Sequence, residues 1–341
     1  MAAHTDYIGG LPPFWSASPS VLHTKHVARH HDYLKIYESQ EIAMIEAWPS
    51  IKLDLFSLDQ IGYDPNLELD WRNQASAHTD CLLKYKEAAQ FIIFGDVDDV
   101  LLPKLGISYI EEFRLLSHSH PTAAGFTYSR YNTALNTGTT PQQFSLSQVI
   151  GGAEIANEWE DGKYVVNTSR VETAWLHYPG SFFLPLMFTI PDDVNIMVHL
   201  RNWTLHSRLN DGLLKHKTPI TAKPLHKTQI NDLISNEALK AIQVNFNQLM
   251  HSTNYTAFLH LPVTSHYLPL IVECYNTMFY SVGRKPTSCP GPLKCQLPSI
   301  PGLKCSVAST FFRKKSISWR TSLQIAENPG QFVTNLNGCS L

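Results

Sequence analysis

The clearest pattern of apolar and polar positions lies in the middle of the chain. Residues 71–89 contain several apolar residues and no Gly or Pro, which predicts a long helix. An apolar run at 91–94 follows and ends at Gly95, which is typical of a buried strand in a parallel sheet. Apolar residues at positions 107, 110, 113 and 116 recur at helical spacing and predict an amphipathic helix packed on that sheet.

Weaker patterns flank this region. Further helices are predicted at 33–39 and 235–250, with a weaker one at 269–282. Further strands are predicted at 42–47, 124–131, 163–167 and 171–177, with a short apolar run at 196–199. Residues 50–68 are expected to form a loop. Because helices and strands alternate, the sequence predicts an α/β fold with a doubly wound sheet.

The composition is that of a folded protein. Of 341 residues, 43% are hydrophobic and 16% charged, which favours a substantial core and suits one large domain or two modest ones. The formal net charge of −2 argues against binding of nucleic acid or an anionic membrane through bulk electrostatics. The local basic cluster at 313–315 is interpreted as a solvated surface patch.

Neither a signal peptide nor a transmembrane helix is predicted. No window approaches the ~18 uninterrupted apolar residues of a membrane-spanning helix. The apolar segment 180–190 is short and contains a proline. Residues 1–20 lack the charged start and apolar core of a signal peptide.

The cysteines point to an oxidising compartment. Five of the six lie in the last part of the chain, at Cys274, Cys289, Cys295, Cys305 and Cys339. Their spacing does not match zinc-binding pairs, so disulfides are expected, with the pairing left open. Sequons that are compatible with a secretory-pathway lumen and with glycosylation occur at Asn167, Asn202 and Asn254.

The residues that follow the apolar run 91–94 carry candidate chemistry. Asp96 and Asp98 are two positions apart, so in an extended chain their side chains leave the same face. Two close carboxylates repel each other unless a cation lies between them. A hard divalent cation fits, because it takes oxygen ligands and keeps positions open for phosphate oxygens. The motif therefore predicts a metal site that serves a phosphorylated substrate, and Asp99 extends the acidic loop.

Two other interpretations of this motif remain open. Asp at a strand end often caps the following turn or helix. An apolar run followed by D-x-D-x-V is also similar to phosphatases of the haloacid dehalogenase type. In that case Asp96 would be the nucleophile and Asp98 the acid/base.

Longer motifs surround the acidic residues. They are R-N-Q-A at 72–75, T-D-C-L-L-K-Y-K at 79–86 and D-D-V-L-L-P at 98–103. Others follow as W-E at 159–160, G-K-Y-V-V at 162–166, W-L-H at 175–177 and V-H at 198–199. Together these motifs resemble glycosyltransferase family 92, over roughly residues 33–280.

The resemblance implies both a fold and an activity. The fold would be of the GT-A type, a Rossmann-like mixed sheet flanked by helices, followed here by an irregular Cys/Pro-rich C-terminal region. The family's members resemble galactosyltransferases that use a UDP-sugar donor, a glycan acceptor and manganese (Mn²⁺, or another divalent cation), and that invert the anomeric centre. The chain would then be a hexosyltransferase of the secretory pathway, in the Golgi, where its relatives are membrane-anchored.

The resemblance also implies site residues. Asp96, Asp98 and His199 would be the metal ligands. Asp98 would be the surer ligand of the pair, and Asp96 would face either the ribose or the metal. Imidazole is an acceptable ligand for Mn²⁺.

Substrate-binding residues and a base are implied as well. The substrate-binding candidates, for which a surface or helix-cap role stays open, are Arg72, Asn73, Gln74 and Asp80. An inverting transferase needs a base for the acceptor hydroxyl. Glu158 and Glu160 are the candidates, although a solvated acidic loop explains that segment equally well.

One departure from the family motivates an alternative function. The family's domain normally opens with an apolar strand, which residues 1–32 do not show. The alternative is a catalytically impaired GT-A-like protein that binds a glycan or a partner. The expected organisation is a loose N-terminal tail at 1–32, a family 92-like catalytic domain at 33–282 and a Cys/Pro-rich extension at 283–341.

Overall fold

The structure is a computed structural model of the chain. It describes residues 25–41, 43–48, 51, 53–64, 74–135, 143–179, 187–200, 224–250, 254–259, 266–267, 270, 273, 297–319, 321–328 and 330–339. The chain divides into two compact units. One contains His78–Leu259, and the other contains Pro19–Ala77 together with His260–Leu341.

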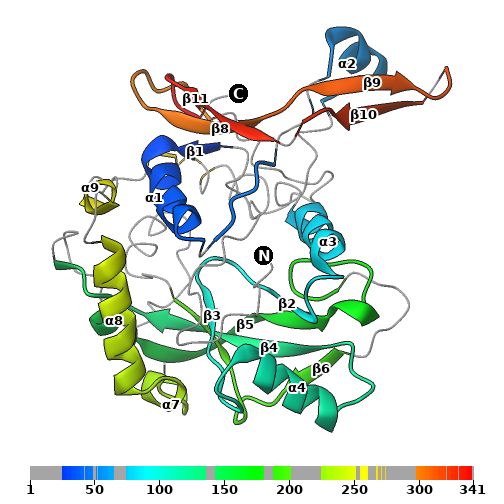
Figure 1. The fold of residues 1–341 in the computed structure, drawn as a ribbon. Coiled ribbons are helices and arrows are strands. Elements are labelled where there is room, and N and C mark those ends of the chain that lie inside the picture. The colour runs from blue at the N-terminus through cyan, green and yellow to red at the C-terminus, as the bar shows by residue number, and fades with distance from the viewer. Residues whose placement is uncertain are drawn as a thin grey trace. The chain divides into compact units, whose positions relative to one another are not determined.

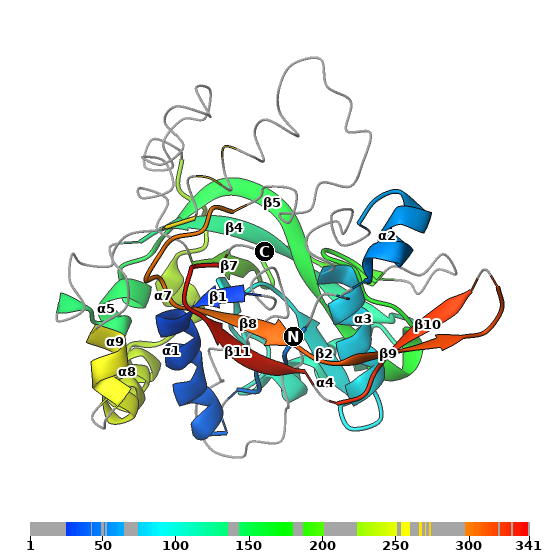
Figure 2. The same ribbon diagram turned by 90° about the horizontal axis from the view of Figure 1, so that it is seen from above.

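The first unit is built on a curled mixed sheet (Figure 1, Figure 2). Its strands are β2 (Phe91–Phe94), β3 (Asp99–Leu101), β4 (Gly125–Ala134), β5 (Glu154–Asn167), β6 (Met187–Ile190) and β7 (Met197–His199). They lie in the order β2-β5-β4-β7-β3, and β6 pairs with the first part of β4. Strand β4 runs parallel to β6 and β7 and antiparallel to β5. The predicted α/β fold with a mixed sheet is confirmed and is consistent with a GT-A-like architecture.

Helices cover both faces of this sheet (Figure 1). They are α3 (Gln74–Tyr85), α4 (Tyr109–Ser119), α5 (Leu146–Gly151), α7 (Ile230–Leu233), α8 (Asn236–Met250) and α9 (Asn254–Leu259). Helix α4 begins where the Ser108 side chain accepts a hydrogen bond from the Glu111 amide. Helix α8 buries Leu239 and Ile242 of its predicted apolar stripe. Helices α3, α4 and α8 therefore confirm the three predicted helices in their main part. The helix predicted at 71–89 extends too far, because α3 ends at Tyr85 and residues 86–88 form a turn. Residues 71–73 lie outside the described residues.

Strand β2 corrects the prediction of a parallel strand, because it pairs antiparallel with β5. Its side chains alternate between two hydrophobic clusters. Phe91 packs in the cluster of Phe113 from α4, and Ile92 packs in the cluster of Leu82 from α3. The run 91–94 is apolar because both of its faces are covered. Burial on both faces is usual in parallel sheets, and here it occurs in an antiparallel edge strand.

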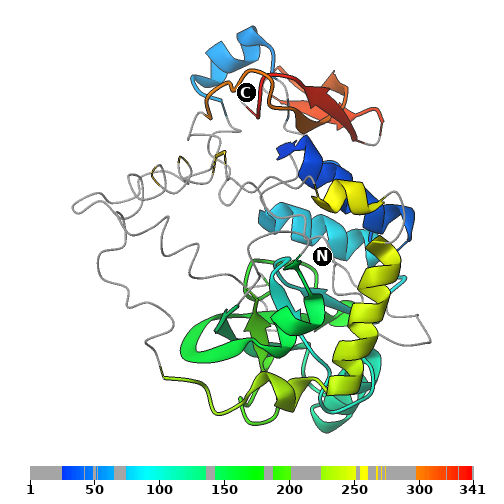
Figure 3. The same cartoon turned by 90° about the vertical axis from the view of Figure 1, so that its left-hand side faces the viewer.

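The second unit contains two smaller antiparallel sheets. Strands β1 (Lys25–Val27), β8 (Cys305–Ser309) and β11 (Gln331–Asn335) form one sheet, and β9 (Phe312–Ser316) and β10 (Ser322–Ala326) form a hairpin. The helices of this unit that are described with their bounds are α1 (Ala28–Ser39) and α2 (Leu55–Ile61). Helix α2 lies beside the hairpin, where Lys314 Nζ donates to Ser57 Oγ (Figure 1, Figure 3). A disulfide joins Cys305 to Cys339, as expected for the C-terminal cysteines.

Local predictions in the second unit need correction. Among the described residues, which start at Lys25, helix α1 begins at Ala28, earlier than the predicted helix at 33–39. Residues 43–48 form no strand, because the Ile45 amide donates to the Glu38 side chain. The predicted loop at 50–68 contains α2, which has a capping Asp54 before it and a left-handed Gly62 after it. The predicted helix at 269–282 lies almost wholly outside the described residues.

In the first unit, residues 171–177 do not form the predicted strand. The backbone groups of Ala174 bond to the Thr79 side chain, and those of Trp175 bond to the Tyr164 hydroxyl, so these groups are not available to a neighbouring strand. The acidic segment 154–161 is not a loop but the first half of β5. None of the described helices combines the length and the apolar character that crossing a bilayer requires.

Candidate metal site

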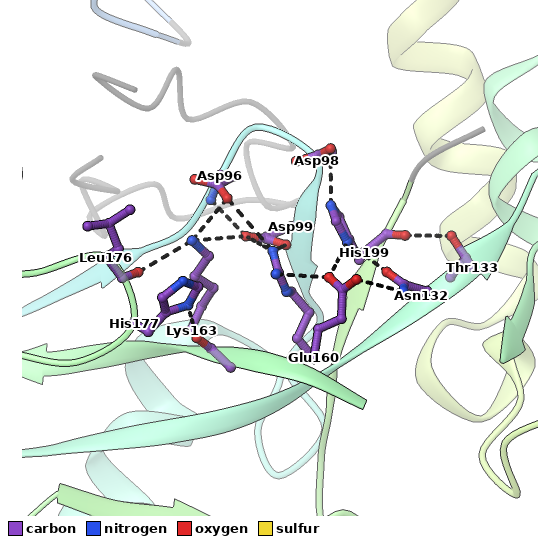
Figure 4. A network of polar contacts seen from close by, with 12 residues as sticks. Asp96, Asp98, Asp99, Asn132, Thr133, Glu160, Lys163, Leu176, His177 and His199 are labelled. Atoms are coloured by element: carbon purple, nitrogen blue, oxygen red, sulfur yellow. Dashed lines mark hydrogen bonds and ion pairs between the residues drawn. The ribbon is translucent and has the colours of Figure 1, made fainter. Parts of the chain in front are cut away.

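Strand pairing in the first unit brings the acidic turn against His199 (Figure 4). Asp99 lies opposite His199 in the β3–β7 pair, and Asn132 lies beside His199 in the β4–β7 pair. Side chains of directly opposed residues project from the same face of a sheet. Asp99, His199 and Asn132 therefore form a row across three strands that are far apart in the sequence.

The turn between β2 and β3 places two more carboxylates, those of Asp96 and Asp98, beside this row. The Asp99 amide donates to the Asp96 carbonyl at 3.1 Å, and the Asp96 amide donates to Asp99 Oδ2 at 2.9 Å. Asp99 thus also has the turn-capping role that the sequence left open. Asp98 Oδ2 lies 3.2 Å from His199 Nε2. One ligand atom each from Asp98, Asp99 and His199 lie within 4.8 Å of one another, and this group could hold a metal ion.

Hydrogen bonds fix the orientation of the His199 ring. Asn132 Nδ2 donates to Glu160 Oε1 at 2.9 Å, and Asn132 Oδ1 faces His199 Nδ1 at 2.9 Å. An amide oxygen only accepts, so His199 Nδ1 carries a proton. In the neutral ring, Nε2 then directs its lone pair at the Asp98 carboxylate. That contact is repulsive unless a proton or a metal ion lies between the two groups, so Nε2 is placed where it can bind a metal ion together with Asp98.

Two buried cations at the site escaped the sequence analysis. Lys163 is 1% exposed, and its Nζ lies 2.9 Å from Asp96 Oδ2. Arg130 Nη1 lies 3.1 Å from Asp99 Oδ1, and its Nη2 lies 3.0 Å from Glu160 Oε2. The structure therefore pairs Asp96 with a lysine, whereas the metal-ligating trio predicted from sequence has Asp96 in the place of Asp99.

A β-bulge in β5 brings Lys163 into the site. Glu160 and Lys163 are three positions apart and would project from opposite faces of a regular strand. The register with β4 shifts between Tyr128, opposite Lys163, and Arg130, opposite Glu160. A Cβ at Gly162 would lie 2.2 Å from the Tyr128 carbonyl oxygen, so only glycine fits there. The sequence signal was a lysine that directly follows a glycine and opens a buried strand segment.

The charges in this cluster do not balance. Its four carboxylates (Asp96, Asp98, Asp99 and Glu160) face two permanent cations, Arg130 and Lys163. With a neutral His199, two negative charges remain, which is the charge that a divalent cation compensates. Burial raises the pKa of Asp99, and the neighbouring Asp96 carboxylate adds to that rise.

The two candidate bases have different surroundings. Burial alone would raise the pKa of Glu160. Hydrogen bonds with His199 and Asn132, together with the Arg130 guanidinium, outweigh that effect and lower the pKa to about 2. Such a carboxylate is a weak base. Glu158 is half-buried on the same strand, with Oε2 3.5 Å from Asn132 Nδ2.

The predicted substrate-binding residues lie on or before α3. Gln74 is buried and Asp80 is exposed, and both lie on α3 rather than in the network of Figure 4. Arg72 and Asn73 lie outside the described residues.

A loop links α3 to the cluster. Thr79 Oγ1 of α3 donates to the Ala174 carbonyl, and the Leu176 carbonyl of the same loop accepts from Lys163 Nζ at 3.3 Å. His177 Nδ1 donates to the Gly162 carbonyl at 3.0 Å, beside the bulge. The loop therefore connects the helix with the lysine that pairs with Asp96.

Comparison with known proteins agrees with the sequence resemblance. The model of glycosyltransferase family 92 matches residues 27–250. Glycosyltransferase family 92 protein F59C6.8 of Caenorhabditis elegans is 35% identical over 316 residues, which are 91% of this chain and 60% of the relative. Protein F13G3.3 of the same family and organism is 30% identical over 318 residues, which are 91% of this chain and 61% of that relative. The chain thus spans about three fifths of the length of these relatives.

Proposed function

The chain belongs to glycosyltransferase family 92, and we propose that it transfers a hexose, galactose by preference, from a UDP-sugar to a glycan acceptor with inversion at the anomeric carbon. The observation that carries this proposal is the group of Asp98, Asp99 and His199 at the edge of the first unit's sheet. Family membership also favours the glycosyltransferase interpretation of the D-x-D motif over the phosphatase interpretation.

The donor set fits Mn²⁺ or another divalent cation. Two carboxylates and one imidazole with its Nδ1 proton already engaged suit such an ion. Asp98, Asp99 and His199 would hold it. When bound, the ion stabilises negative charge on the departing nucleotide.

The chain's own residues have separate tasks in this proposal. Lys163 holds Asp96 out of the ligand group, in a place from which Asp96 can face the donor's ribose. Arg130 holds Asp99 and Glu160 in fixed positions through its two terminal nitrogens. These ion pairs organise the site before the donor arrives, which lowers the cost of ordering it later.

We assign the base to Glu158 rather than to Glu160. With a pKa of about 2, Glu160 holds a proton weakly, and its oxygens are engaged by Arg130, Asn132 and His199. Glu158→Gln is expected to lower kcat by about 10² to 10⁴, with KM for the donor little changed. An equal or larger kcat loss in Glu160→Gln, at unchanged Mn²⁺ affinity, would reverse the assignment.

We place the protein in the lumen of the secretory pathway, as a glycoprotein of the Golgi. The Cys305–Cys339 disulfide supports an oxidising compartment. The Asn167 sequon at the end of β5 is half-buried, and its side chain accepts from Ser169. Mass spectrometry of the protein expressed in a eukaryotic host, with and without glycosidase, tests the glycosylation.

A second candidate is a catalytically impaired relative that still binds a nucleotide or a glycan. Within residues 25–90, no described strand joins the six-stranded sheet, since β1 pairs with β8 instead. In its described part, the sheet therefore lacks the opening strand that would help to form the family's nucleotide site.

One assay separates the two candidates. UDP release is measured with a panel of UDP-sugars, with and without Mn²⁺, for the chain and for Asp98→Asn. The proposed activity predicts Mn²⁺-dependent release with UDP-galactose, reduced to background in Asp98→Asn and unchanged in the exposed control Asp193→Asn. Mn²⁺-dependent UDP binding without turnover would favour the impaired protein, and absence of both would refute both candidates.

A further inference from the structure

The β9–β10 hairpin is a basic segment of an otherwise slightly acidic chain. Residues 310–326 contain Arg313, Lys314, Lys315 and Arg320 and no Asp or Glu, whereas the whole chain carries a formal net charge of −2. The strands pair in regular register, with Lys315 opposite Leu323. The hairpin therefore carries a local positive charge that the bulk composition does not show.

The tip of the hairpin exposes apolar side chains. The turn is closed by the Ile317 amide, which donates to the Thr321 carbonyl at 2.8 Å. Ile317 is 60% exposed and Trp319 is 85% exposed. Leu323 is 47% exposed on the adjoining strand, and Phe311 is 73% exposed at the base. Exposed large apolar residues gathered on one element mark an interaction surface more often than scattered ones do.

The charged and apolar side chains share one face of the hairpin. Arg313 and Lys315 are two positions apart, so they project from the same face, opposite Ile325 and Leu323. Lys314 projects from the other face and contacts α2 through Ser57. Arg313 Nε also lies 3.3 Å from Glu327 Oε1, in an exposed ion pair. One face thus combines Lys315 and the Glu327-paired Arg313 with apolar side chains and leads to the apolar tip.

Helix α2 lies against the other face of the hairpin. Lys314, which projects from that face, lies 3.7 Å from Asp54 and donates to Ser57. The face that carries Arg313 and Lys315 is therefore not the one that contacts α2.

We propose that the β9–β10 hairpin docks on an anionic phospholipid surface. Trp319 and Ile317 enter the interfacial region, where Trp is favoured because its ring is apolar and its N–H can bond to headgroups or water. Lys315 contacts the anionic headgroups, and Arg313 joins it because its exposed ion pair with Glu327 is weak. A glycan is a poorer fit for this surface, because the aliphatic side chains of Ile317 and Leu323 offer nothing to sugar hydroxyls.

The test is co-sedimentation of the full chain with phosphatidylcholine vesicles, with and without phosphatidylserine. Wild-type protein is expected to bind only the phosphatidylserine-containing vesicles, and added salt is expected to weaken binding. Trp319→Ala should lower vesicle affinity about tenfold or more, because it removes the largest inserted side chain. Lys315→Gln should lower it about fivefold and reduce the salt dependence.

A matched control lies outside the hairpin. Ile107 is 98% exposed in the first unit, so Ile107→Ser removes an exposed apolar side chain elsewhere and should leave vesicle binding unchanged. The proposal is overturned if wild-type protein ignores anionic vesicles, or if Trp319→Ala binds them as wild type does. Binding to an acidic polysaccharide that is lost in Trp319→Ala, without vesicle binding, would assign the hairpin to a glycan instead.

Discussion

The two halves of the acidic turn, one with Asp96 and the other with Asp98, have different partners in the fold. In the first half, Asp96 pairs with Lys163, a side chain that is 1% exposed and bonds at the same time to the Leu176 carbonyl. In the second half, Asp98 faces His199 Nε2, an atom that takes either a proton or a metal ion. One carboxylate has a cation built into the protein, and the other lies where a cation can be added.

The difference teaches that a D-x-D motif does not by itself define the ligand set. Both carboxylates leave a strand end two positions apart, and only the family resemblance made Asp98 the surer ligand. The cations on the neighbouring strands separate them, because a carboxylate already paired with a buried lysine gains less from a metal ion. Asp99, which follows the motif, takes the remaining place in the candidate group.

The largest expected effect comes from Gly162→Ala. This substitution changes the β-bulge that places Lys163 beside Asp96, in the first half of the acidic turn. A Cβ there would lie 2.2 Å from the Tyr128 carbonyl oxygen, a backbone atom that cannot move cheaply. We expect a loss of about 3 kcal/mol or more in the free energy of unfolding, measured by urea denaturation. Gly95→Ala is the matched control, because its nearest contact would be an ordinary 3.5 Å. Equal losses in the two variants would contradict the close approach at the bulge.

Lys163→Met is expected to separate stability from metal binding. It leaves Asp96 without its lysine partner, at a cost of about 3 kcal/mol in unfolding free energy, the low end for a buried pair because Asp96 is partly exposed. Mn²⁺ affinity, measured by electron paramagnetic resonance, should not fall. Lys163 is not in the proposed ligand group, and its removal takes away a positive charge 3.9 Å from Asp99 that opposes a bound cation. Lys240→Met, on the exposed side of α8, serves as the control. A loss of Mn²⁺ affinity as large as that in Asp98→Asn would return Asp96 to the ligand set.

Much of the fold could be predicted from the sequence. Helices α3, α4 and α8 follow the apolar spacing, and β2 follows its four-residue apolar run. The sheet order could not be predicted, because β5 begins with the acidic segment 154–161 and looks like a loop. The first half of β5 pairs with the second half of β4, so missing it hid half of the antiparallel β4–β5 pair. The pairing of β2 with residues 164–167 gave no signal in the sequence, because both segments are apolar runs.

The site could be predicted only in part. Asp98 was predicted from its position in the D-x-D motif after an apolar run, and His199 was predicted from the family resemblance. Arg130 and Lys163 were missed because each is one charged residue in a strand, and the bulge at Gly162 breaks the period of two that would place them. Asn132 gave no signal, because its role depends on strand pairing with His199 across 67 positions of sequence.

Acidification should lower the free energy of unfolding through His78, which bonds to the loop that also contacts Lys163. This residue donates from Nδ1 to the Trp175 carbonyl, and burial lowers its pKa from 6.5 to about 3. Above pH 6.5 the ring is neutral in both the folded and the unfolded chain. Below it, only the unfolded chain takes up the proton, so stability falls by about 1.4 kcal/mol per pH unit, or about 2 kcal/mol at pH 5.

The measurement is urea denaturation between pH 7 and pH 4 for wild type, His78→Gln and the exposed control His118→Gln. Carboxylate contributions are common to all three proteins, so the difference between curves isolates the histidine. His78→Gln should show a shallower loss of stability with falling pH, while His118→Gln should follow wild type. Parallel curves for wild type and His78→Gln would show that His78 accepts a proton in the folded protein.

The smallest effect, and the most specific to the second half, is expected from Asn132→Leu. Without the Asn132 oxygen, His199 Nδ1 loses its nearer acceptor, at 2.9 Å, and keeps Glu160 Oε2 at 3.3 Å, so the ring orientation is held less firmly. Mn²⁺ affinity should fall by about tenfold, the lower end for loss of a residue that orients a ligand. Asn132→Asp keeps an acceptor oxygen at this position and should restore part of the affinity.

Asn195→Leu supplies the control that makes this result interpretable. Asn195 is equally buried and donates to the Leu102 carbonyl and to Glu112, away from the acidic cluster. Both leucine variants should lose stability, because each leaves buried polar groups without partners. Only Asn132→Leu should also lose Mn²⁺ affinity. If both variants lost it equally, the effect would come from general loosening of the sheet, and His199 would need no orienting residue to act as a ligand.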